Sequence, residues 1–183
     1  MAIEYGDKEE ASYNLAFLYQ TMGKPELMEA YLATESGKNN SAEVLYNLAL
    51  SYDNAGNKEN AEKYYKQAIE KGQSTKAMKN LAILYYEKGQ KENSLIYYEQ
   101  LVDGYNMYEE AYNTGMICNQ LKQKEEALKY FGISYEKANN KNALYYLGVI
   151  NYDLGKMELA KKYLKMAEKN GDEAAKLMLE GME

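Results

Sequence analysis

The fold is decided by residues 41–72, which read SAEVLYNLALSYDNAGNKENAEKYYKQAIEKG. A first set of apolar side chains in this stretch recurs at helical spacing: Val44, Leu45, Leu48, Ala49 and Tyr52. Gly56 follows this set, and a glycine ends a helix at little cost because it has no Cβ to oppose the left-handed conformation. A second apolar set comes after the glycine: Ala61, Tyr65 and Ala68. The stretch therefore predicts two amphipathic helices joined by a short turn.

The same pattern recurs every 33 residues along most of the chain. Three series keep this spacing: the pairs Leu15-Ala16, Leu48-Ala49, Leu81-Ala82, Thr114-Gly115 and Leu147-Gly148; the tyrosines Tyr31, Tyr64, Tyr97, Tyr130 and Tyr163; and the glycines Gly23, Gly56, Gly89 and Gly155. Lys122 stands where the glycine series has a gap. We expect an altered turn there, because a left-handed lysine costs roughly 1 kcal/mol.

This repetition predicts an all-α solenoid, since a two-helix repeat cannot bury both of its apolar faces alone and must stack on its neighbours. We expect one domain, 1–183, with repeats near 8–40, 41–73, 74–106, 107–139 and 140–171 and a terminal helix near 172–183. The expected helices are 8–22, 25–36, 41–55, 58–71, 74–88, 91–103, 107–121, 124–137, 140–154, 157–169 and 172–180. Polar residues between repeats are expected, for the most part, to cap the next helix: Asn40-Ser41, Gln73-Ser74, Asn106, Asn139-Asn140 and Asp172.

The quoted stretch resembles the tetratricopeptide repeat family. The family pattern is an aromatic residue, Leu-Gly/Ala, Tyr, Gly, Ala, an aromatic residue and Ala, and it is matched by Tyr46, Leu48-Ala49, Tyr52, Gly56, Ala61, Tyr65 and Ala68. The usual family period is about 34 residues, and the family's trailing proline is absent from every repeat of this chain. Residues 68–82 also look like the related Sel1-like repeats. The resemblance implies a right-handed superhelix of antiparallel helix pairs.

In the family the first helix of each repeat lines a concave groove that binds other proteins. The resemblance places these groove residues at Tyr13, Phe17, Tyr46, Leu50, Lys79, Ile83, Tyr112, Met116, Tyr145 and Val149, beside an asparagine series, Asn14, Asn47, Asn80 and Asn113, that ends in Tyr146. Aromatic rings give a large contact area, and asparagine suits the backbone of an extended peptide. We therefore predict a scaffold that binds a peptide or an amphipathic helix of a partner protein.

Other interpretations of the same residues remain open. The groove tyrosines could instead fill the space between neighbouring first helices. The ends could stack head to tail in a structural, self-assembling module, because 172–180 begins a sixth repeat, and Ala2-Ile3-Glu4 aligns with Ala68-Ile69-Glu70 of a second helix. That alignment predicts either a piece of a longer array or an N-terminal cap.

Composition excludes several classes of site. The chain has no histidine and a single cysteine, Cys118, so it lacks the usual catalytic triads and zinc sites. We predict no enzymatic activity, no metal and no cofactor, and we expect Cys118 and the tyrosine series to fill the core. All 22 basic residues are lysine and the net charge is −6, which argues against nucleic acid as a partner.

Charge and apolar runs add expectations about location and partners. No apolar run is long enough for membrane insertion. Residues 1–37 carry a net charge of −5, so this end could attract a basic partner. Lysine without arginine suggests an AT-rich bacterial genome, and a cytoplasmic location is expected.

Overall fold

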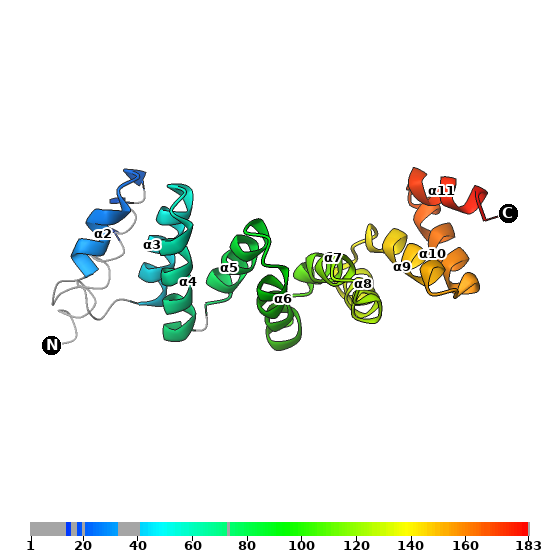
Figure 1. Cartoon of the computed structure of the whole chain (residues 1–183), viewed down its shortest axis with the longest axis horizontal. Helices are drawn as coiled ribbons and strands as arrows, with labels where there is room; N and C mark the ends of the chain where they lie inside the picture. Colours follow the sequence, from blue (N-terminus) through cyan, green and yellow to red (C-terminus); the bar gives the residue numbers. More distant parts are fainter. Residues whose placement is uncertain (1–13, 16–17, 20, 33–40, 73, 183) are drawn as a thin grey trace. The chain divides into compact units, whose positions relative to one another are not determined.

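The computed structural model describes residues 14–15, 18–19, 21–32, 41–72 and 74–182, with the side chains of 31 and 32 excepted. Helices account for all the regular structure in these ranges (Figure 1). They are α2 (Pro25–Leu32), α3 (Ala42–Asn54), α4 (Lys58–Gly72), α5 (Thr75–Glu87), α6 (Lys91–Glu99), α7 (Ala111–Gln120), α8 (Lys124–Ala138), α9 (Ala143–Asp153), α10 (Met157–Lys169) and α11 (Glu173–Glu180). The expected helix 8–22 lies largely outside the described residues.

The chain divides into an N-terminal unit, Met1–Tyr97, and a C-terminal unit, Tyr98–Glu183. In the N-terminal unit, α3 and α4 lie side by side and run antiparallel, because only the short turn at Gly56 joins them (Figure 1). In the C-terminal unit, α7 pairs with α8 and α9 pairs with α10, and α11 packs on α10. The predicted pairs 41–55 with 58–71, 107–121 with 124–137 and 140–154 with 157–169 are therefore present.

The predicted apolar stripes form the core of the N-terminal unit. The residues that define them are all buried: Val44, Leu45, Leu48, Ala49, Tyr52, Ala61, Tyr65 and Ala68. The tyrosine series also packs inward, with Tyr64 and Tyr130 buried and Tyr97 and Tyr163 half-buried. Cys118 is a buried free thiol, as predicted. The helical period thus identified the core residues of α3 and α4.

Three of the predicted N-caps are confirmed. The hydroxyls of Ser41 and Ser74 accept hydrogen bonds from backbone N–H groups three residues later, at 3.4 Å and 3.3 Å, and Asp172 does the same at 3.0 Å. Asn106 and Asn139 are not caps of the next helix. Both are left-handed, with φ of 55° and 53°, and Asn139 ends α8. Asparagine tolerates this conformation better than most residues, so it serves here at the end of a helix.

The approach to α7 also differs from the expected helix start at 107. Helix α6 continues into a π-helical turn, Gln100–Gly104, and α7 is preceded by a 3-10 turn, Tyr108–Glu110. The left-handed Asn106 stands between them and directs the chain into the next first helix.

Lys122 adopts the left-handed conformation, with φ of 61°, but the turn around it is not altered. Its N–H donates to Asn119 at 3.0 Å and the next N–H donates to Cys118 at 2.9 Å. Gly56 and Asn57 make the equivalent bonds to Asp53 and Tyr52, each at 2.9 Å. The expectation of an altered turn was wrong, because the hydrogen bonds at the end of α7 hold the lysine in the conformation that glycine adopts elsewhere.

Lys122→Gly is therefore expected to stabilise the protein by about 1 kcal/mol, since it removes the Cβ strain of a left-handed residue. The midpoint and slope of urea unfolding, followed by circular dichroism, give the change in free energy. The control is Lys165→Gly, an exposed position inside α10, where the same substitution should cost about 1 kcal/mol. Two losses of similar size would contradict the assignment of strain to Lys122.

Candidate functional site

The predicted groove residues of the N-terminal unit lie on α3 and α5 and stay partly exposed. They are Tyr46, Asn47, Leu50, Lys79, Asn80 and Ile83, and together we call them the N-terminal groove face. Ile83 is 37% exposed, whereas Leu48 and Leu81 on the same helices are at most 1% exposed. Asn14 is exposed, and Tyr13 and Phe17 lie outside the described residues. The two helices thus present one face to the core and a second to the surface.

A hydrogen-bond network fixes the aromatic part of this face. The side-chain amide of Asn80 donates to the hydroxyl of Tyr46 at 3.3 Å and to that of Tyr65 at 3.2 Å. The rings of Tyr46 and Tyr65 are 6.1 Å apart, and the Tyr65 hydroxyl donates to Asp53 at 3.3 Å. Burial raises the pKa of Tyr65, so its proton is kept for this bond. Asn80 therefore orients Tyr46, and its role in peptide binding stays a prediction.

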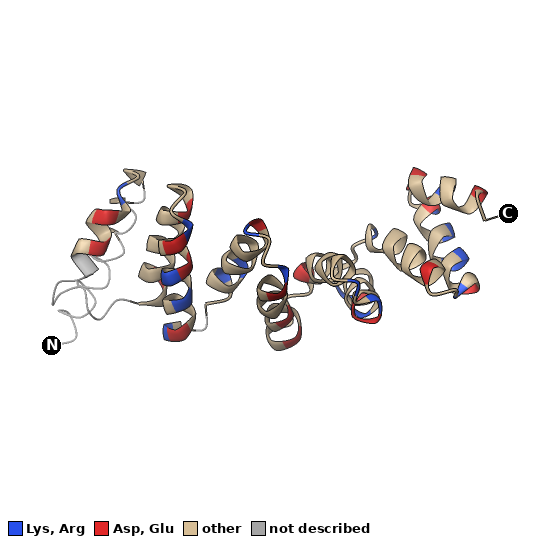
Figure 2. Ribbon diagram, in the orientation of Figure 1, with Lys and Arg blue, Asp and Glu red and all other residues tan. Residues whose placement is uncertain are grey.

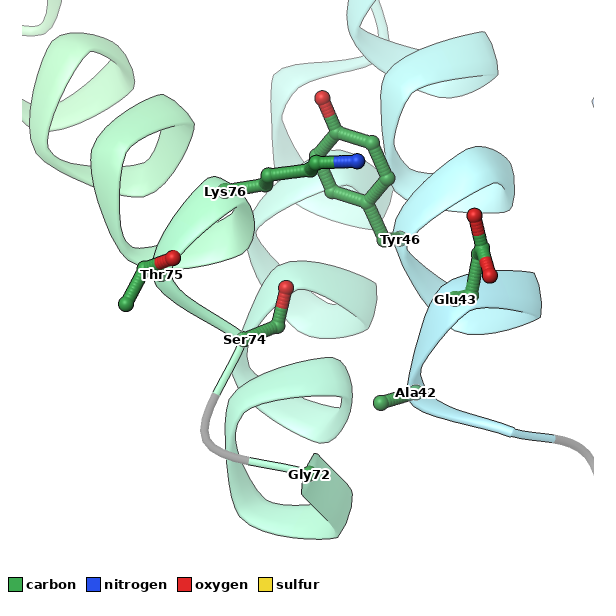
Figure 3. A pocket seen from close by; sticks show the side chains of 7 residues that line it. All are labelled: Ala42, Glu43, Tyr46, Gly72, Ser74, Thr75 and Lys76. Atoms are coloured by element: carbon green, nitrogen blue, oxygen red, sulfur yellow. The ribbon is translucent and has the colours of Figure 1, made fainter.

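An open pocket adjoins Tyr46 at the start of both groove helices (Figure 3). Its volume is about 340 Å³, and its lining consists of Ala42, Glu43, Tyr46, Gly72, Ser74, Thr75 and Lys76. Lys76 and the Tyr46 ring border one side of it, and Ser74 and Gly72 border another (Figure 3). The pocket has a mixed polar and apolar lining, offers one carboxylate and one ammonium group, and is large enough for a single side chain of a bound segment.

The C-terminal unit carries the corresponding residues on α7 and α9: Tyr112, Asn113, Met116, Tyr145, Tyr146 and Val149, which we call the C-terminal groove face. Tyr146 stacks on the buried Phe131 with ring centres 4.9 Å apart. Tyr112 and Tyr145 both meet Tyr146 edge to face, at 5.9 Å and 5.4 Å. Burial, together with a hydrogen bond to Tyr146, raises the pKa of Tyr112 to about 12. The rings form one cluster whose outer edges remain accessible.

Sequence reasoning missed the part of this face that lies on α11 and directly after it. Met178, Leu179 and Met182 are half-buried and pack with Tyr145 against the cluster around Leu144 and Leu164. They lie 33 residues after Tyr145, Tyr146 and Val149. The repeat spacing could have identified them, but the search for groove residues stopped at the fifth repeat.

Among the described residues no group of three or more histidine, cysteine, aspartate or glutamate side chains could hold a metal ion. Burial raises the pKa of the Cys118 thiol to about 12, which removes it as a nucleophile near neutral pH. Within the described ranges, no helix is both long and apolar enough to span a bilayer.

Models of the tetratricopeptide repeat match three segments of the chain. One model matches residues 42–70, and a second matches residues 76–105 and 142–170. These segments contain α3 and α4, α5 and α6, and α9 and α10. No curated protein sequence matches the chain.

Solved structures with a similar fold include YrrB, whose title describes a tetratricopeptide-repeat protein with an unusual peptide-binding site. It is 21% identical, with a TM-score of 0.70, over 98% of this chain and 96% of that one. MamA from Desulfovibrio magneticus RS-1 is 17% identical, with a TM-score of 0.64, over 91% and 98% of the two chains. A further MamA structure is 18% identical, with a TM-score of 0.69, over 93% and 96%. At these identities the likeness concerns the fold, and it confirms the predicted all-α solenoid of antiparallel helix pairs.

Proposed function

We infer the function from the family to which the protein belongs: the chain is a tetratricopeptide-repeat protein, and we propose that it is a scaffold that holds a peptide or an amphipathic helix of a partner protein against its groove faces. The observation that carries this proposal is the exposure of those faces. Each predicted groove residue that the structure describes is at least partly accessible, although its helix neighbours are buried. Apolar and aromatic side chains at helical spacing suit such a ligand.

Two further features support the proposal. Apart from Lys79, the residues of both groove faces carry no charge, and most of them are apolar or aromatic. Exposed side chains of this kind are typical of an interaction site when they gather on one face. YrrB, which has the same fold, is described as having a peptide-binding site. A peptide is the ligand class that these features share.

Ile83→Lys is expected to weaken binding of a selected peptide at least about tenfold, because the new charge would lose water inside an apolar contact. Peptides are first selected from a displayed library on the immobilised full-length chain. The affinity of the best one is then measured by fluorescence anisotropy for the wild type and the variant.

The matched control is Ile96→Lys on α6. Ile96 is 51% exposed, and lysine occupies the same position in other repeats as Lys63, Lys129 and Lys162. Ile96→Lys should leave the affinity unchanged while adding the same charge to the same unit. If both variants bind equally well, or if both lose binding equally, the peptide does not lie on the groove face.

Several expectations from the sequence stay predictions. They are head-to-tail assembly, a cytoplasmic location, a bacterial origin, the Sel1-like likeness, the single-domain organisation, and the lack of catalysis and of nucleic-acid binding. One observation favours assembly, since Leu177 on α11 is 67% exposed. A molar mass that rises with concentration in light scattering would support it.

A further inference from the structure

Helix α10 carries a concentrated positive charge. Its lysines are Lys161, Lys162, Lys165 and Lys169, against the two carboxylates Glu158 and Glu168. Lys162, Lys165 and Lys169 are exposed and spaced by three and four residues, so they share one face of the helix. We call these three residues the lysine face, and the blue segments along α10 mark the lysines of this helix in Figure 2. Such a face is unexpected in a protein whose net charge is −6.

Comparison between repeats shows that the charge is not neutralised as it is elsewhere. Lys63 and Lys129 stand at the position of Lys162 in earlier repeats, and they pair with Glu29 at 3.3 Å and with Asp103 at 3.0 Å. In the part of the chain that the structure describes, no carboxylate lies within ion-pair distance of Lys162, Lys165 or Lys169. Glu158 and Glu168 are exposed but do not fold back onto the lysines.

The position before Lys162 also differs in charge between the repeats. Glu29 and Glu62 occupy this position in the first two repeats, and Lys161 occupies it in α10. Glu62 binds Lys66 and Lys88 at 2.8 Å and 2.7 Å. The last second helix therefore has a lysine where the first two repeats have a lysine-binding carboxylate. Among the described residues Lys162 has no carboxylate partner, and its nitrogen lies 5.6 Å from the centre of the Tyr163 ring.

We propose that the lysine face of α10 is a second interaction surface, which binds an acidic segment of a partner protein. Leu159, which is 43% exposed and lies three residues before Lys162, adds an apolar contact at its edge. The face lies on a second helix and not on the groove helices, so this proposal does not depend on the peptide site proposed above.

An acidic polypeptide fits this surface better than the other common polyanions do. From Lys162 to Lys169 the face is about 10 Å long, at about 1.5 Å per residue, which is close to the Debye length of about 8 Å at cell salt. A short acidic segment therefore meets the lysines without sensing the rest of the molecule. A nucleic acid or an anionic membrane extends over the whole negatively charged protein, and the chain has no arginine to bind phosphate in a bidentate manner.

The test uses the full-length chain and a fluorescein-labelled glutamate-rich peptide, with the same peptide bearing glutamine as the neutral probe. Lys162→Gln/Lys165→Gln/Lys169→Gln should weaken binding of the acidic peptide about tenfold at low salt, since three charge contacts are lost. In wild-type protein, the peptide should shift the backbone amide NMR signals of α10 more than those of α7 and α9. This NMR mapping tests whether the peptide binds at α10 even if the triple variant does not fold.

The control variant removes the same number of charges elsewhere. Lys24→Gln/Lys71→Gln/Lys137→Gln changes three exposed lysines outside α10 and should alter the affinity less than about twofold. Equal losses in the two variants would mean that binding follows net charge and would overturn the proposal. The proposal would also be overturned if the lysine face bound a single-stranded oligonucleotide of equal charge, or phosphatidylserine vesicles, more tightly than the acidic peptide. The partner class would then be wrong.

Discussion

Gly148→Ala is expected to destabilise the protein by about 2 to 3 kcal/mol, although alanine is the better helix former by about 1 kcal/mol. Gly148 lies in α9, where a Cβ would stand 2.6 Å from Cγ and 2.7 Å from Cδ2 of Leu164, and 3.2 Å from the Leu164 backbone nitrogen. Leu164 is fully buried in α10 and cannot move aside without displacing its own neighbours. The two helices must therefore separate, and the free energy of urea unfolding should fall.

The control for this substitution lies in the same unit. Gly132 is inside α8, and a Cβ added there meets no other atom within 4 Å. Gly132→Ala should therefore stabilise the protein by about 0.5 to 1 kcal/mol, through helix propensity alone. The same chemical change should thus have opposite signs at two helical glycines. A gain at both positions would show that α9 and α10 are not in such close contact.

The sequence predicted the helix pairs but not the reason for this glycine. One position on the first helix of each repeat, which recurs every 33 residues, holds a small residue. It is Ala49, Ala82, Gly115 and Gly148 in successive repeats. At Gly115 a Cβ would lie 3.0 Å from the Phe131 ring, and at Gly148 it would meet Leu164. The 33-residue repeat and the apolar stripe of the first helix show that a small residue faces the partner helix. The distance between helix axes, which decides between alanine and glycine, depends on packing across the whole pair.

For the candidate site, too, the sequence predicted the positions of residues but not their contacts. The family resemblance indicated which residues of α3, α5, α7 and α9 would remain on an accessible face. It could not show that the Asn80 amide is used by Tyr46 and Tyr65, because those hydroxyls come from two other helices. It also could not show that the lysines of the lysine face are unpaired. Whether a lysine forms an ion pair depends on a carboxylate that lies far away in the sequence.

Glu62→Gln is expected to cost about 1 to 2 kcal/mol at neutral pH, since it removes charge-assisted hydrogen bonds at a partly exposed position. Glu62 accepts a hydrogen bond from Tyr85 at 2.9 Å and pairs with Lys66 at 2.8 Å and Lys88 at 2.7 Å. The contacts with Tyr85 and Lys88 join α4 to α5 and to its C-cap, and so they tie one repeat to the next. Glu59→Gln, at an exposed position on the same helix, should change stability by less than about 0.5 kcal/mol.

The pH dependence of this loss identifies its cause. Burial on its own would raise the pKa of Glu62, but hydrogen bonds from Lys66, Lys88 and Tyr85 outweigh it and lower the pKa to about 2. Because the folded-state pKa is depressed, the stabilisation is complete above the ordinary value of 4.5 and is lost as the pH falls from there towards 2. The difference between wild type and Glu62→Gln should therefore shrink over that interval. A difference that stays constant with pH would mean that packing, and not charge, accounts for the loss.

The same contact explains a correlation between distant positions of the sequence. Glu29 with Tyr52 and Glu62 with Tyr85 are carboxylate–hydroxyl pairs separated by 23 residues. In the next repeats leucine replaces the carboxylate, as Leu95 and Leu128, and the tyrosine is replaced together with it, by Cys118 and Asn151. A buried hydroxyl without its acceptor costs more than the loss of both partners. In a double-mutant cycle, Glu62→Leu and Tyr85→Phe should therefore cost about 1 kcal/mol less together than the sum of the single changes; simple additivity would mean that the two positions change independently.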